Sequence, residues 1–91
     1  MDRCLLCGME WGIEYHHIFE GPFRKKSTKY GLVVPLCVFC HRVGRDSIHE
    51  GYTDLARKRK ELLKKYGQSK VMHEQGWTKE DFIREFGRNY L

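Results

Sequence analysis

The four cysteines of the chain form two pairs with the same spacing, and thiol pairs of this kind bind metal ions. Cys4 and Cys7 make the first Cys-x-x-Cys pair, and Cys37 and Cys40 make the second. Each such turn brings two thiolates to one side of the backbone, and two turns complete the tetrahedral sulfur shell that zinc prefers. Two disulfides, or a single redox-active pair, are the alternatives, but neither explains why both pairs share one spacing. We therefore predict a structural zinc ion held by all four cysteines.

The histidines are candidates for a second kind of chemistry. His41 directly follows Cys40, and if both open a helix their side chains diverge by about 100°, so that His41 faces away from the zinc. His16 and His17 would point to opposite faces of a regular strand, so that only one meets His41 unless the strand ends or bulges there. Hydrolysis of a phosphodiester needs one group to hold a divalent ion and another to take a proton from water, and imidazoles do both.

Each histidine also has a structural interpretation. His41 could replace a cysteine in the zinc shell, and His16 or His17 could be a packed strand residue with a satisfied ring nitrogen. His49 could be a further metal ligand, a phosphate contact or a surface histidine. We expect His73 on a helix surface. The joint pattern of His16, His17 and His41 around the cysteine pairs favours the catalytic interpretation.

The formal net charge of +5 is concentrated in two basic blocks, residues 23–30 and 54–66. Clustered Lys and Arg are typical of a protein that binds a phosphate backbone, although a solvated helix face explains the second block equally well. The first block, which we expect in a loop, favours phosphate more strongly. The candidate contacts to nucleic acid are Arg24, Lys25, Lys26, Lys29, Arg57, Lys58, Lys60 and Lys64.

Two short strands and a helix must position the cysteines and histidines. The run Glu14–Phe19 is rich in aromatic and β-branched residues and predicts a strand. Residues 32–34 predict a second strand that ends at Pro35, and a helix can begin at about Phe39 and stop at Gly44.

The rest of the chain predicts two more helices. Thr53 or Asp54 can cap the first, which carries apolar residues at helical spacing. Thr78 begins a capping box for the last helix. The apolar stripes that we expect to be core are Leu55, Leu62, Leu63 and Tyr66 on the first, and Phe82, Ile83, Phe86 and Tyr90 on the second.

The size and composition indicate a small globular protein. At 91 residues and 41% hydrophobic content, the chain is folded but short of a secure apolar core, and a bound zinc ion would supply the missing stability. No apolar run approaches the roughly 20 residues that span a bilayer, and the N-terminus does not resemble a signal peptide. We therefore expect a cytoplasmic protein with no membrane partner.

Three motifs follow one another along residues 4–50 and together resemble a known family. They are the first cysteine pair, then His16-His17-Ile18, then Pro35-Leu36-Cys37-Val38-Phe39-Cys40-His41. This order is similar to the zinc-stabilised HNH endonucleases, which have the ββα-metal (treble-clef-like) fold. The paired histidines and Ser47-Ile48-His49 look similar to small phage nucleases of the RecA-dependent, Ref-like type. One position departs from the pattern, because Leu32 stands where the family usually has its middle asparagine.

The resemblance implies an α+β fold and a metal-dependent DNA endonuclease. Residues 1–52 would form the nuclease core and residues 53–91 a basic helical extension packed on it, in a single domain overall. His17 would be the general base, and His16 and His41, with His49, would hold Mg²⁺ or another divalent ion. The partners implied are DNA and a recombinase filament, in the cytoplasm of a bacterial host of a phage or prophage. A monomer would nick DNA, and a homodimer would cut both strands. The competing hypothesis is a non-catalytic zinc module that binds nucleic acid or a protein.

Overall fold

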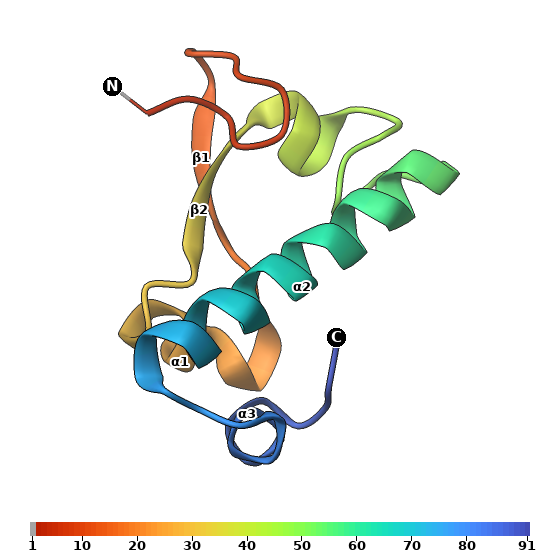
Figure 1. The fold of residues 1–91 in the computed structure, drawn as a ribbon. Helices are drawn as coiled ribbons and strands as arrows, with labels where there is room; N and C mark the ends of the chain where they lie inside the picture. Colours follow the sequence, from red (N-terminus) through yellow and green to blue (C-terminus); the bar gives the residue numbers. More distant parts are fainter. Residues whose placement is uncertain (1) are drawn as a thin grey trace. The chain divides into compact units, whose positions relative to one another are not determined.

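The computed structural model describes residues 2–91 and has an α+β architecture with one two-stranded sheet. Figure 1 shows the elements in chain order, and the predicted α+β class is confirmed. No helix within the described residues is long and apolar enough to cross a bilayer. The elements are β1 (Ile13–His17), the 3-10 turn η1 (Gly21–Phe23), α1 (Arg24–Lys29), β2 (Val33–Cys37), the π-helical turn η2 (Phe39–Val43), α2 (Asp54–Gln75) and α3 (Lys79–Phe86).

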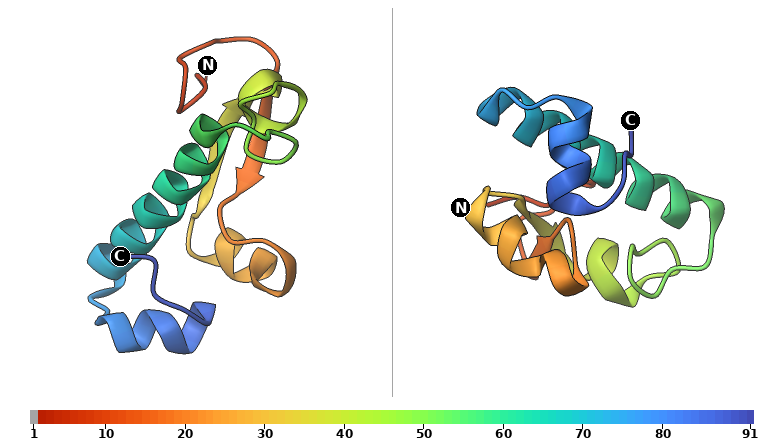
Figure 2. Two further views of the ribbon diagram at one scale, coloured as in Figure 1. Left: turned by 90° about the vertical axis from the view of Figure 1, so that its right-hand side faces the viewer. Right: turned by 90° about the horizontal axis from the view of Figure 1, so that it is seen from below.

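The two strands are antiparallel and lie side by side in both Figure 1 and Figure 2. Backbone bonds flank the pair at each end, from Ile18 N–H to the Leu32 carbonyl and from Val38 N–H to the Gly12 carbonyl. The second strand does not end at Pro35, as the sequence predicted, but continues to Cys37. The Pro35 carbonyl accepts from the Leu5 N–H, so the polar edge of this residue faces away from β1 and a proline without an N–H costs no bond between the strands.

Two segments, one between the strands and one between β2 and the long helix, differ from the sequence predictions. The basic segment predicted as a loop forms a short helix, α1, because nothing in Arg24–Lys29 breaks a helical turn once Pro22 has begun η1. The segment after β2 is a π-helical turn, and it ends at Gly44 as predicted.

The long helix α2 is uninterrupted, as Figures 1 and 2 show, and its bounds include Gly67. Thr53 caps it, with its hydroxyl oxygen accepting from the Ala56 N–H at 3.1 Å. The predicted apolar stripe is wrong in part, because Leu55, Leu62 and Tyr66 are all more than 40% exposed. The buried positions of α2 are Ala56, Leu63, Gly67, Gln68 and Val71.

The last helix, α3, begins with the predicted capping box. The Thr78 hydroxyl accepts from the Asp81 N–H, and the Asp81 carboxylate accepts from the Thr78 N–H. Its buried face consists of Phe82 and Phe86, whereas Ile83 is exposed. The two phenylalanine rings stack with centroids 4.9 Å apart and both contact the ring of Phe19.

The contacts divide the chain into two units, each with its own core. Unit 1 comprises Val33–Lys60 and the N-terminal residues up to His16, and unit 2 comprises His17–Leu32 and Glu61–Leu91. Unit 1 buries Val34, Leu36, Ile48 and Ala56 with three of the cysteines, and unit 2 buries Ile18, Phe19, Leu32, Leu63, Val71, Phe82 and Phe86. The predicted boundary between residues 52 and 53 stays a prediction.

Candidate metal centres

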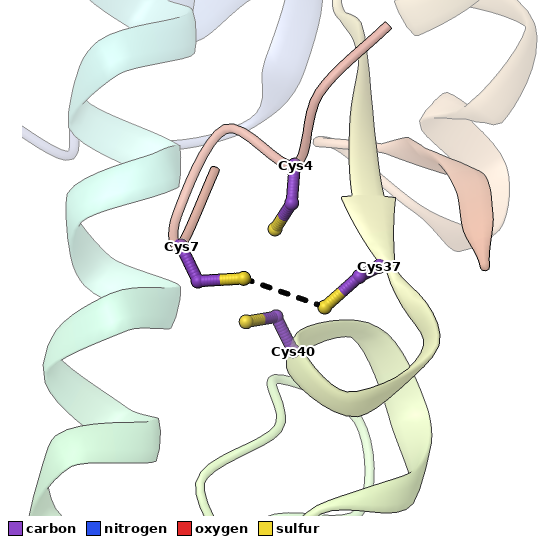
Figure 3. A group of neighbouring side chains, drawn as sticks. All are labelled: Cys4, Cys7, Cys37 and Cys40. Carbon is purple, nitrogen blue, oxygen red and sulfur yellow. Dashed lines mark hydrogen bonds between the residues drawn. The ribbon is translucent and has the colours of Figure 1, made fainter. Parts of the chain in front are cut away.

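The four cysteines of unit 1 converge, as the sequence predicted. Figure 3 shows Cys4 and Cys7 on the N-terminal turn, Cys37 at the end of β2 and Cys40 in η2, with their sulfurs pointing toward one another. The four sulfurs all lie within 4.8 Å of one another, and those of Cys7 and Cys37 are 3.6 Å apart. A tetrahedral zinc ion with bonds of about 2.3 Å separates its sulfur ligands by roughly 3.8 Å. The cluster therefore has the dimensions of a zinc site.

The N-terminal turn is built by local hydrogen bonds and one glycine. The Gly8 N–H donates to the Cys4 carbonyl at 2.9 Å, and Gly8 has a φ of 81°, which a side chain would strain. The Leu5 N–H donates to the Pro35 carbonyl at 2.9 Å and joins this turn to β2. The first cysteine pair is thereby held against the strand that leads to the second.

The electrostatics of the cluster favour a thiolate at Cys4. Burial opposes ionisation of Cys4, but backbone N–H groups, led by that of Cys37, hydrogen-bond its sulfur and bring its pKa down to about 6. Burial and the neighbouring sulfurs raise the pKa of Cys40. The Arg59 guanidinium donates to the Asp46 carbonyl and lies 3.8 Å from the Cys40 sulfur. A divalent cation would remove the repulsion between the thiolates, so the donor set fits zinc.

Three histidines of unit 1 form a second cluster. His16 comes from β1 and is buried, His41 comes from η2, and His49 comes from the exposed loop that follows. One ring nitrogen of each lies within 4.8 Å of the others, and the Nε2 atoms of His41 and His49 are 3.1 Å apart. Two imidazole ligands of one tetrahedral ion, with bonds of about 2.0–2.1 Å, would be separated by roughly 3.4 Å. The three predicted ligands are therefore brought together.

The loop after η2 folds back by two hydrogen bonds that place His49 beside His41. The Ile48 N–H donates to the Cys40 carbonyl at 2.9 Å, and the His49 N–H donates to the His41 carbonyl at 3.1 Å. The ring centroids of the two histidines are 4.7 Å apart. His41 does not replace a cysteine in the sulfur cluster, because its two ring nitrogens contact Glu14 and His49.

Glu14 and Arg42, which the sequence reasoning missed, support the histidine cluster. Oε1 of Glu14 accepts from His41 Nδ1 at 2.8 Å, and both carboxylate oxygens of Glu14 accept from the Arg42 guanidinium. Hydrogen bonds from Arg42, and then from His41, hold the pKa of Glu14 at about 2. One signal was present in the sequence, because Glu14 and His16 are two residues apart and share one face of a strand.

His17, the predicted general base, belongs to unit 2 and is outside the three-histidine cluster. Its Nε2 lies 3.1 Å from the Thr28 hydroxyl oxygen. Burial, and then the charge of Arg24, lower the pKa of His17 below its ordinary value. The ring is therefore held in its neutral form at physiological pH, which is the form that accepts a proton. His73 is exposed on α2, as expected.

The predicted nucleic-acid contacts differ in how their side chains are used. The Lys26 ammonium binds the carboxylate and the backbone carbonyl of Glu85, and the Lys64 ammonium donates to the Ile18 carbonyl and lies over the Phe19 ring. Arg57 forms an ion pair with Asp54 at the exposed start of α2. The remaining candidates are exposed, and they are Arg24, Lys25 and Lys29 in unit 2 and Lys58 and Lys60 in unit 1.

A scan against protein-family models and searches of curated proteins and of solved structures found no match to this chain. Leu32, the residue that departs from the resembled pattern, is fully buried in unit 2.

Proposed function

We propose that the protein is a metal-dependent DNA endonuclease of the HNH type with the ββα-metal fold. The observation that carries the proposal is the convergence of His16, His41 and His49 beside a separate four-cysteine cluster. The order of β1, β2 and η2 agrees with the ββα arrangement, with η2 in the place of its helix. The two clusters differ in ligand chemistry, and this difference favours a stabilising ion at the cysteines and a reactive ion at the histidines.

The donor atoms favour different ions at the two centres. Four thiolates would hold zinc in a closed shell with no position open to substrate. Three imidazoles leave at least one coordination position for a phosphate oxygen, and a divalent ion there would neutralise charge on the scissile phosphate. The three-histidine cluster contains no carboxylate ligand, whereas Mg²⁺ prefers oxygen ligands. We therefore propose a transition ion such as Mn²⁺ or Ni²⁺ in preference to Mg²⁺.

The remaining steps of the proposed reaction belong to the protein's own residues. His17, held neutral beside Thr28, would take the proton from the attacking water. The exposed residues Arg24, Lys25 and Lys58 would hold the DNA backbone and give affinity without sequence choice. Lys26 and Lys64 already bind groups of the protein, so we expect them to contribute less to DNA binding.

Plasmid cleavage tests this proposal. Zinc-loaded protein should nick or cut supercoiled plasmid with added Mn²⁺ or Ni²⁺, and more slowly with Mg²⁺. His17→Ala should abolish cleavage without changing the zinc content, and His73→Ala, at an exposed position on α2, should leave cleavage unchanged. Identical plasmid forms from the wild type and His17→Ala with every ion would refute the nuclease. If salt-dependent DNA binding remained in that case, it would support the alternative of a non-catalytic zinc module.

A further inference from the structure

We propose that Glu14 is a positioning residue that fixes the tautomer of His41, and that Arg42 fixes the orientation of Glu14. The inference deepens the proposed metal site and rests on it for its role in catalysis. The tautomer itself is a property of the protein before any ion binds the histidines, so it can be tested separately.

The hydrogen bond at His41 Nδ1 determines where the ring proton lies. Nδ1 of His41 is 2.8 Å from Oε1 of Glu14. An ionised carboxylate only accepts hydrogen bonds, so Nδ1 must carry the proton. In the neutral ring the lone pair is then at Nε2, the atom that faces Nε2 of His49 at 3.1 Å. The nitrogen directed into the cluster is therefore the one able to bind a metal ion.

Arg42 restricts the carboxylate to the orientation that His41 requires. Its Nε lies 2.9 Å from Oε1 and 3.0 Å from Oε2 of Glu14, and its Nη2 lies 2.8 Å from Oε2. This two-pronged arrangement holds the plane of the carboxylate as well as its position. Oε1 of Glu14 is shared between the two neighbours, and Arg42 and His41 are consecutive in η2. The Glu14 side chain therefore links β1, from which it comes, to His41 and Arg42 in η2.

The tautomer matters because a neutral imidazole left to itself carries its proton mainly on Nε2. Without Glu14, His41 would present an N–H to the cluster, and the proton would have to move before the ring could bind an ion. Removing a group that orients a metal-binding histidine in this way commonly costs 10–100-fold in metal affinity. We expect a loss of that size here.

The same assignment determines the proton on His49. Because Nε2 of His41 accepts, Nε2 of His49 must donate in the 3.1 Å contact when no ion is bound at the histidines. An ion held by both rings requires His49 to move its proton to Nδ1. Ion binding should therefore change the tautomer of His49 and leave that of His41 unchanged.

Nitrogen NMR of the histidine rings tests the inference directly. The full chain is loaded with zinc at the cysteines and studied above the ordinary imidazole pKa of about 6.5, where free rings are neutral. Wild-type His41 should show the Nδ1–H tautomer. Glu14→Ala should convert it mainly to Nε2–H, and Glu14→Gln, which keeps an acceptor oxygen, should restore much of the Nδ1–H signal. Glu10→Ala, which breaks the exposed ion pair with Arg3, is the matched control and should change nothing.

Cobalt titration supplies the second measurement. Co²⁺ bound by nitrogen ligands is followed by its visible absorption, separately from the charge-transfer bands of a Co²⁺–thiolate site. Glu14→Ala should weaken Co²⁺ binding 10–100-fold, and Glu14→Gln and Arg42→Lys should weaken it less. An Nε2–H tautomer of His41 in the wild type, or a tautomer and affinity indifferent to Glu14, would overturn the inference. The expected tautomer and affinities without plasmid cleavage would support the inference and refute only the nuclease.

Discussion

Replacing Cys37 by serine should remove the zinc ion and unfold unit 1. Cys37 is fully buried, and its sulfur lies 3.6 Å from that of Cys7. A serine hydroxyl is a poor zinc ligand and lies closer to the backbone than a thiolate, so three ligands would remain. The protein should then lose most of what the metal contributes.

The magnitude of this loss decides the outcome. Structural zinc contributes about 10–16 kcal/mol to small zinc-finger peptides at neutral pH. A domain of 91 residues has a total stability on the order of 5–14 kcal/mol. Half of the metal's contribution would be about 5–8 kcal/mol, which is of the same order as the stability of the whole chain, so its loss should unfold unit 1. Unit 2 retains the aromatic contacts of Phe19, Phe82 and Phe86, so its backbone signals should outlast those of unit 1.

Native mass spectrometry and backbone NMR measure the two consequences together. The wild type should carry zinc and give well-dispersed amide chemical shifts. Cys37→Ser should carry no zinc, and the amide signals of residues 33–60 should collapse to unfolded chemical shifts. Val43→Ser is the matched control, since Val43 is an exposed residue of the same unit, and it should keep the metal. A Cys37→Ser protein that is zinc-free and still folded in unit 1 would refute the reasoning.

Two further predictions concern unit 2. Gly67→Ala places a methyl group 3.0 Å from the Ile18 side chain, so overpacking of about 1–3 kcal/mol should outweigh a helix-propensity gain of about 1 kcal/mol and lower the melting temperature by several degrees. The control Ser69→Ala, at an exposed position of the same helix, should not lower the melting temperature. A higher melting temperature for Gly67→Ala would contradict the packing argument. Hydrogen bonds from the Thr78 backbone and hydroxyl lower the pKa of Asp81 below 3.8. The stability that this carboxylate adds to α3 is therefore complete above that pH and lost as the pH falls through the lowered pKa. Denaturant midpoints of the wild type and Asp81→Asn should differ at pH 7 and converge in strong acid, and a constant difference would disprove the linkage.

The sequence predicted those features that local spacing determines. The Thr78 capping box forms and Gly44 ends the turn η2, because each depends on residues close together in the chain. The two cysteine pairs lie far apart in the sequence, and their convergence was predicted because one tetrahedral ion takes four thiolates. The strand spacing alone left open whether His16 or His17 meets His41, and the family resemblance named His16. The alternation of side chains along a strand explains why only one of the two joins the cluster.

The features that the sequence did not predict depend on contacts between distant residues. Leu62 is exposed and Leu63 buried although both fit an apolar stripe, because the burial of a helix is decided by what packs against it. Glu14 looked like an ordinary strand carboxylate until η2 brought His41 and Arg42 to it. Lys26 and Lys64 counted as basic surface until their intramolecular partners were known.

The turn η2 places three consecutive residues in three different environments. Cys40 points into the sulfur cluster, His41 into the histidine cluster, and Arg42 onto the carboxylate that orients His41. A single peptide bond therefore joins a candidate ligand in the sulfur cluster to a candidate ligand in the histidine cluster. Occupancy of the two centres should be thermodynamically linked, since an ion that orders η2 from one side prepares it for the other. By reciprocity, each ion would raise the affinity for the other by the same factor.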